Sequence, residues 1–244
     1  MDELILHGLA CGYSGQRVLN TMYTVFPPGE LCALLGLNGS GKSTLLRTVS
    51  GLLPAVSGFC SLGGRKLSGM KVRQRAQVVS FIPQRPSTLE GATVQEVLLM
   101  GLTPWLGLLE SPGKAQRDSA LETGMRMGVG EWMDKDFSCL SEGQKQLVLL
   151  ARTTVQKTTV MIMDGPDGAL DYVNRHDMMR RLSDLVHEEK KICLMATHDP
   201  NFALEYCDRI LILKDGEARW DFLPAKADRK ELEQALSCLY GNII

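Results

Sequence analysis

The sequence lacks an excess of charge of either sign. Its 244 residues include 27 Lys and Arg against 28 Asp and Glu, which gives a formal net charge of −1. A nucleic-acid-binding domain usually has a clear basic excess, so this balance predicts no nucleic-acid partner. Hydrophobic residues make up 44%, as in ordinary globular proteins. The length is sufficient for one domain with a large core.

The sequence also shows no candidate for a membrane-spanning helix. The uncharged, largely apolar stretch 97–109 contains glycine and proline. It is shorter than the roughly 20 apolar residues that a spanning helix needs. The chain begins with Met1, Asp2 and Glu3, whereas a secretory signal would begin with basic residues. We therefore expect a chain that is soluble by itself and reaches a membrane only through a partner.

Paired cysteines are missing as well. The seven cysteines are an odd, scattered set without a C-x-x-C pair, which argues against a disulfide framework or a zinc site. Cys32 and Cys193 fall inside apolar runs and are expected to be small core residues. This cysteine usage is typical of the reducing cytoplasm.

Three short apolar runs are present, at 31–35, 160–163 and 192–196, and each is followed at once by glycine or polar residues. Continuous apolar runs without alternation indicate strands buried on both faces, as in a parallel sheet. Helical stretches lie between them, so the expected fold class is α/β. Functional groups in such sheets gather at the carboxyl ends of the strands.

The rest of the chain predicts smaller units within a single domain spanning 1–244. Segments 4–9 and 17–26 favour a small antiparallel sheet. Asp215-Gly216 between 209–214 and 217–222 is a strong hairpin signal. The segment 90–156 is expected to be a helical subdomain inserted into the α/β core.

A phosphate-binding loop follows the first apolar run. Residues 36–44 fit the pattern G-x-x-x-x-G-K-[ST], in which backbone N–H groups surround phosphate oxygens. Lys42 supplies a positive charge for the β and γ phosphates, and Ser43 offers a hydroxyl to Mg²⁺. A helix beginning near Lys42 would add its positive end. The expected nucleotide-binding residues of the loop are Asn38, Gly39, Ser40, Gly41, Lys42, Ser43 and Thr44.

An acidic residue ends the second apolar run. Asp164 follows 160–163 directly and would hold Mg²⁺, because hard cations prefer oxygen ligands. An apolar run that ends in Asp is weak support by itself. Together with the upstream phosphate loop it indicates a site for ATP and Mg²⁺.

The segment Leu140-Ser141-Glu142-Gly143-Gln144 resembles the Leu-Ser-Gly-Gly-Gln signature of the ABC ATPases. Ser141 and Gln144 also fit a capping box that opens a helix. The resemblance implies a P-loop NTPase core with a parallel sheet, an N-terminal antiparallel β subdomain and an inserted helical subdomain. It also implies that Ser141, Gly143 and Gln144 reach across a dimer to the γ phosphate on the partner. Glu142 departs from the family glycine, and its side chain is expected to point away.

Further positions match the family in order. The resemblance implies that Tyr13 stacks on adenine, and that Gln84 touches Mg²⁺ and senses the permease. Asp171 falls in the loop that contacts the opposite subunit. His198, directly after the third apolar run, corresponds to the switch histidine that bonds the γ phosphate. His198, Gln84 and Asp164 are thus the expected catalytic residues, and Ser43, Gln84 and Asp164 the expected metal-binding ones.

A narrower resemblance concerns two segments. Residues 97–107 and the ending Leu239-Tyr240-Gly241 resemble the ATPases of iron–siderophore, heme and cobalamin uptake. This implies an importer subunit on the cytoplasmic face of the membrane. Its partners would be transmembrane permease subunits docking near Gln84, a second ATP-binding subunit, identical or not, and indirectly an extracytoplasmic substrate-binding protein. The alternative is a soluble non-transport ABC protein acting as an ATP-dependent clamp in assembly or regulation.

One family residue is missing. The ABC ATPases have a glutamate after the metal-binding Asp, and it activates the attacking water; here that position is Gly165. Loss of a general base costs about 10²–10⁴-fold in rate, whereas positioning and charge stabilisation dominate phosphoryl transfer. The chain could hydrolyse ATP slowly, or close as a clamp that stays closed. Asp167 could replace the base only with a rearranged backbone.

Overall fold

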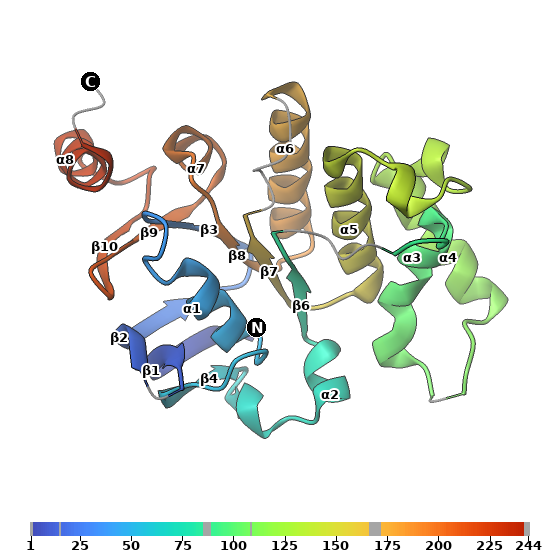
Figure 1. Cartoon of the computed structure of the whole chain (residues 1–244), viewed down its shortest axis with the longest axis horizontal. Coiled ribbons are helices and arrows are strands. Elements are labelled where there is room, and N and C mark those ends of the chain that lie inside the picture. Colours follow the sequence, from blue (N-terminus) through green and yellow to red (C-terminus); the bar gives the residue numbers. More distant parts are fainter. Residues whose placement is uncertain (1, 15, 85–88, 108, 166–171, 242–244) are drawn as a thin grey trace.

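The computed structural model describes residues 2–14, 16–84, 89–107, 109–165 and 172–241. Its centre is a six-stranded sheet in the order β10-β9-β3-β8-β7-β6 (Figure 1). The middle strands β3 (Glu30–Leu35), β8 (Ile192–Ala196) and β7 (Val160–Asp164) pair in parallel. These are the three apolar runs, so the predicted parallel sheet is confirmed. All residues of β7 and β8 are buried, which explains why the runs do not alternate.

The two edges of this sheet differ. β6 (Val79–Ile82) pairs with β7 in parallel, and β9 (Arg209–Lys214) pairs with β3 in parallel. β10 (Glu217–Phe222) is antiparallel to β9, as the hairpin signal predicted. Asp215 and Gly216 both have positive φ, 53° and 77°. A two-residue turn that follows the twist of the strands requires this conformation.

A second sheet is antiparallel and has the order β2-β1-β4-β5. It consists of β1 (Leu4–Tyr13), β2 (Gln16–Phe26), β4 (Ser57–Leu62) and β5 (Arg65–Lys66). β1 extends four residues beyond the predicted segment, because register shifts after Leu6 and Leu9 interrupt its alternation. Helix α1 (Lys42–Val49) packs its apolar side chains between strands of both sheets. The short α2 (Val72–Ala76) precedes β6.

Between β6 and β7, the described residues form helices and turns that extend to one side of the sheet (Figure 1). They are α3 (Val94–Leu99), the 3-10 turn η2 (Met100–Trp105), α4 (Lys114–Arg126), the 3-10 turns η3 (Gly130–Trp132) and η4 (Phe137–Cys139), and α5 (Glu142–Gln156).

The face of the central sheet opposite α1 shares one apolar core with α5, α6 (Tyr172–Glu188) and α7 (Pro200–Tyr206). The last helix, α8 (Arg229–Tyr240), contributes Ala235 and Leu239 to this core. No helix in the described part of the chain is both long and apolar enough to cross a bilayer.

Candidate functional site

The loop between β3 and α1 has the compact shape that a phosphate-binding loop needs. Gly41 caps α1 with a φ of 100°, which L side chains rarely adopt. A Cβ atom at this position would lie 2.7 Å from Cγ of Leu19 on β2, so the loop packs directly against the antiparallel sheet. The first backbone N–H groups of α1 have no partners within the helix. They point out of its positive end and suit an anion.

The ammonium group of Lys42 lies inside this loop. Its Nζ donates to the carbonyl oxygens of Gly36 at 2.7 Å and Leu37 at 3.1 Å. Burial lowers the pKa of Lys42, and the negative charge of Asp164 partly opposes this effect. Lys42 is therefore held in place before any ligand arrives.

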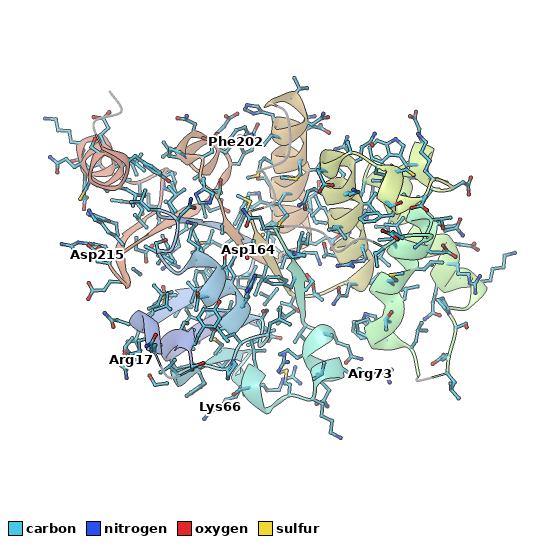
Figure 2. All side chains as sticks on the ribbon, in the orientation of Figure 1. Arg17, Lys66, Arg73, Asp164, Phe202 and Asp215 are labelled. Carbon is cyan, nitrogen blue, oxygen red and sulfur yellow. The ribbon has the colours of Figure 1, made fainter. Side chains whose placement is uncertain are left out.

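Two side-chain oxygens meet between α1 and the end of β7. The hydroxyl of Ser43 donates to Oδ1 of Asp164 over 2.7 Å, and Asp164 is only 5% exposed. Figure 2 labels Asp164 near the middle of the molecule, where the central strands end. A hydroxyl and a carboxylate are oxygen ligands of the kind that Mg²⁺ prefers. This pair fits the predicted metal site.

A cavity of ≈170 Å³ lies at the carboxyl ends of four neighbouring parallel strands, β3, β8, β7 and β6. Within it, the buried hydroxyl of Ser40 has no hydrogen-bond partner among the described residues. Buried polar atoms are rarely left unpaired, so a polar ligand fits there. The cavity is lined by Asn38, Gly39, Ser40, Gly41, Lys42, Ser43, Thr44, Gln84, Asp164, Gly165, Ala196 and His198. The predicted loop residues thus meet Gln84, Asp164 and His198 in one place.

Gly165 forms part of the cavity wall with a φ of 63°, in the left-handed region. Its N–H donates to the carbonyl oxygen of Ala196 at 3.1 Å, which continues the pairing of β7 with β8. A Cβ at this position would lie 3.3 Å from Cγ and Nε2 of Gln84. The position expected to carry the water-activating carboxylate therefore faces the side chain of Gln84.

Gln146 is a residue near the cavity that no sequence motif predicts. This residue of α5 is 2% exposed, and its Nε2 donates to the backbone carbonyl of Gln84 at 3.3 Å. It thereby links the signature helix to the segment that carries Gln84. The available signal was an amide side chain at a buried position of an amphipathic helix, two residues after Gln144.

Tyr13 lies beside the phosphate loop rather than in the cavity wall. Its ring is 44% exposed at the end of β1, and its hydroxyl accepts a long hydrogen bond from the Thr44 hydroxyl at 3.5 Å. An exposed aromatic ring next to a phosphate loop is available for stacking on a flat ligand.

The signature segment lies outside the cavity. Ser141 caps α5: its hydroxyl accepts the N–H of Gln144 at 3.2 Å, and the Gln144 side chain accepts the N–H of Ser141 at 3.0 Å. The predicted capping box is thus confirmed. The Glu142 carboxylate accepts from Lys145 at 2.8 Å along the same helix, which offsets its charge.

Two predicted positions, Asp167 and Asp171, lie outside the described residues.

A P-loop and an acidic strand end that meet at the same edge of a parallel sheet define a nucleotide-binding protein of the P-loop class. Residues 19–168 match the family model described as ABC transporter, and the chain belongs to that family. An ATP-binding protein of a zinc transport system from Treponema pallidum is 37% identical over 207 residues, covering 84% of this chain and 76% of the relative.

Two further relatives bear on function. A hemin import ATP-binding protein from Gloeobacter violaceus is 33% identical over 217 residues, covering 86% of this chain and 78% of its own length. A solved dimeric ATP-binding cassette in a post-hydrolysis state, bound to ADP and phosphate, superimposes with a TM-score of 0.79. That cassette is 25% identical, and the match covers 91% of this chain and 98% of the cassette.

Proposed function

We propose that this chain is the ATP-binding subunit of an ABC importer and that its cavity binds ATP with Mg²⁺. The observation that carries the proposal is the convergence of Lys42, Ser43 and Asp164 on one cavity at the positive end of α1. In this proposal the region 90–156 is the helical subdomain of a single domain.

In this proposal, different residues bind the phosphates, the metal and the adenine of ATP. Lys42 and the N–H groups of the loop hold the β and γ phosphates. Ser43, Asp164 and Gln84 hold the metal, and Tyr13 stacks on the adenine. His198 bonds the terminal phosphate. When bound, ATP with Mg²⁺ supplies the reactive phosphoanhydride and a cation that offsets the charge spread over the phosphates.

Water activation is the weak step. Gly165 has no side chain to take a proton, and the backbone carbonyl and N–H it does have are poor bases. We therefore expect binding of ordinary affinity with slow turnover. A substitute base from Asp167 remains a prediction from the sequence.

The signature segment acts on a second subunit in this proposal. The hydroxyl of Ser141 accepts the Gln144 N–H, so its own proton remains available for a phosphate oxygen. Gly143 and Gln144 would approach the same phosphate, and Asp171 would contact the opposite subunit. The ion pair of Glu142 with Lys145 reduces the repulsion that a carboxylate would cause there. The chain would pair with a copy of itself or with another ATP-binding subunit.

Membrane attachment comes through a partner. We propose that transmembrane permease subunits dock near Gln84, on the cytoplasmic face of the membrane, and that an extracytoplasmic substrate-binding protein delivers cargo to them. Of the iron–siderophore, heme or cobalamin cargo that the sequence predicts, the hemin import relative supports heme. The zinc transport relative makes a zinc cargo the competing outcome. Uptake assays with the permease present distinguish these cargoes.

A second function from another class is a soluble clamp without a permease. Gly165 favours it, because a clamp needs ATP-driven closure but not fast hydrolysis. Co-purification of a membrane permease with this chain would count against the clamp.

Calorimetric titration with ATP and Mg²⁺ tests ATP binding, which both the importer subunit and the soluble clamp require. Lys42→Ala should weaken ATP binding by about 10- to 100-fold, because hydrogen bonds to charged groups are the strong ones. The matched control is Lys114→Ala, which removes an exposed lysine from α4, away from the cavity. Equal affinity in the wild type and Lys42→Ala would contradict the proposal.

A further inference from the structure

Asp199, the residue after His198, fixes the loop between β8 and α7 through local hydrogen bonds. The N–H of Asp199 donates to the hydroxyl of the buried Thr197 at 3.1 Å. One carboxylate oxygen of Asp199 caps α7 by accepting the N–H groups of Asn201 and Phe202, at 3.0 and 3.4 Å. The turn from β8 into α7, on which His198 lies, is therefore fixed at both ends.

The other carboxylate oxygen of Asp199 is bound by a different helix. Arg175 of α6 donates through one guanidinium nitrogen to Oδ2 of Asp199 at 3.3 Å. Its guanidinium carbon also lies 5.2 Å from the centre of the Phe202 ring. Figure 2 labels Phe202 on α7, next to α6. Both partners of the ion pair are about three-quarters buried, with exposures of 24% and 27%. This burial shields the pair from full solvent screening.

A third helix reaches the backbone of His198 itself. The hydroxyl of Tyr240, near the end of α8, donates a long hydrogen bond to the carbonyl oxygen of His198 at 3.5 Å. Burial raises the pKa of Tyr240, and the charge of Asp199 raises it further, so the phenol stays protonated and able to donate. Tyr240 belongs to the Leu239-Tyr240-Gly241 segment, to which the proposed function assigns no role.

We propose that Arg175 and Tyr240 are positioning residues that orient His198 toward the terminal phosphate of ATP. This inference rests on the proposed function. Arg175 fixes Asp199 and Tyr240 fixes the His198 carbonyl, so the histidine backbone is held between α6 and α8. In the chain, α6 follows the segment that begins with Asp164 and Gly165. The Arg175–Asp199 pair therefore connects the helix that follows β7 with the turn that follows β8.

If Arg175 and Tyr240 orient His198, their loss should lower the affinity for ATP but not for ADP. In the proposed function His198 contacts only the terminal phosphate, which ATP has and ADP lacks. Displacing His198 should therefore lower the affinity for ATP and leave the affinity for ADP unchanged. A general loss of folding would lower both affinities. The ratio of the two dissociation constants thus separates positioning from a merely structural role.

The experiment measures ATP–Mg²⁺ and ADP–Mg²⁺ affinities in the full chain by calorimetry. His198→Ala sets the full share of the preference for ATP that His198 provides. Arg175→Ala should lower the preference by about two- to fivefold, as expected for a partly buried ion pair, and Tyr240→Phe by less. Arg175→Lys should restore part of it, because an ammonium can make the N–H···O bond to Asp199 but lacks the planar guanidinium that lies over the Phe202 ring.

Two further variants complete the design. Asp199→Asn keeps a good helix cap but removes the charge, so it should reproduce the effect of Arg175→Ala without loss of α7. The matched control is Arg180→Ala on the same helix, whose arginine is 69% exposed and pairs with Asp177. It should leave the ratio unchanged.

The outcomes distinguish failure of the positioning role from failure of the proposed function. If His198→Ala lowers the ATP preference while Arg175→Ala and Asp199→Asn match Arg180→Ala, this inference is wrong and the proposed function stands. If the wild type binds no ATP, the proposed function is wrong, and the inference falls with it.

Discussion

The backbone at Gly165 lies in the left-handed region, with a φ of 63°. A non-glycine residue in this conformation costs about 1–2 kcal/mol. The Gln84 side chain, 3.3 Å from a Cβ at this position, is exposed and can move aside at little cost. The strain of adding a side chain at 165 is therefore mainly in the backbone, and it is shared by every substitution there.

This shared strain allows a controlled test of water activation. Gly165→Glu should raise steady-state phosphate release by roughly 100-fold or more, because it supplies the missing general base. Gly165→Gln has the same size and the same backbone strain but cannot take the proton, so it should leave release near the wild-type rate. Release is measured with ATP and Mg²⁺, in the presence of the permease.

Gly165→Ala serves as the strain control. All three substitutions should lower the melting temperature by a similar amount, roughly 2–8 °C for a chain of this size. Equal phosphate release by Gly165→Glu and Gly165→Gln would show that the absent carboxylate does not limit turnover. Wild-type turnover as fast as Gly165→Glu would have the same meaning.

Single residues also show where sequence reasoning ends. The spacing of Gly36, Lys42 and Ser43 predicts a phosphate loop, because local geometry is contained in that pattern. The contacts of Arg175 with Asp199 and of Gln146 with Gln84 join residues 24 and 62 positions apart. Only the packing of α6 and α5 against the sheet brings them together. Nor does the glycine at 165 reveal by itself that its φ is positive.

At the scale of elements, the strands of the central sheet were the most predictable. Their signal is local: an apolar run of strand length, ended by glycine or a polar residue. The helical region was predictable only as a whole, because its 3-10 turns and short helices lack the repeated apolar spacing of a long amphipathic helix. The length of β1 was underestimated because its bulges disturb the alternation of side chains.

The start of α5 carries both a structural and a proposed functional role, and the two can be separated. Ser141→Ala removes the cap and should cost about 1 kcal/mol of stability together with ATP-dependent pairing. Ser141→Asp should keep the cap, because Asp caps helices as well as Ser does. Its carboxylate cannot donate to a phosphate and repels it, so pairing should still be lost. Urea unfolding and analytical ultracentrifugation with ATP and Mg²⁺ measure the two effects.

Thr93→Ala provides the comparison within the same region. Thr93 caps α3 with the same reciprocal hydrogen bonds, through Glu96. Its loss should lower stability by a similar amount without affecting pairing. If Ser141→Asp paired as well as the wild type, Ser141 would be only a helix cap.

At the scale of the whole molecule, the two halves of the proposed nucleotide site lie apart. The cavity contains the phosphate loop, Asp164 and His198, whereas Ser141 is exposed at the start of α5 and does not line it. Under the proposed function, a single chain therefore offers one half that binds ATP and a second half that closes the site of a partner subunit. Two chains related by a two-fold axis would complete two sites at once, since each half then meets its complement.

This separation predicts that the dimer forms only with ATP and persists until the ATP is hydrolysed. With ATP and Mg²⁺ the wild type should elute from gel filtration as a dimer, and with ADP as a monomer, because only ATP offers a terminal phosphate to Ser141 of the second chain. Lys42→Ala should stay monomeric under both conditions.

The lifetime of the dimer should follow hydrolysis, so the Gly165→Glu dimer should dissociate sooner than the Gly165→Gln dimer, which has the same backbone strain. A wild type that remains monomeric with ATP would contradict pairing between identical chains and point to a different ATP-binding partner, whereas equal lifetimes for the two variants would mean that hydrolysis is not what opens the dimer.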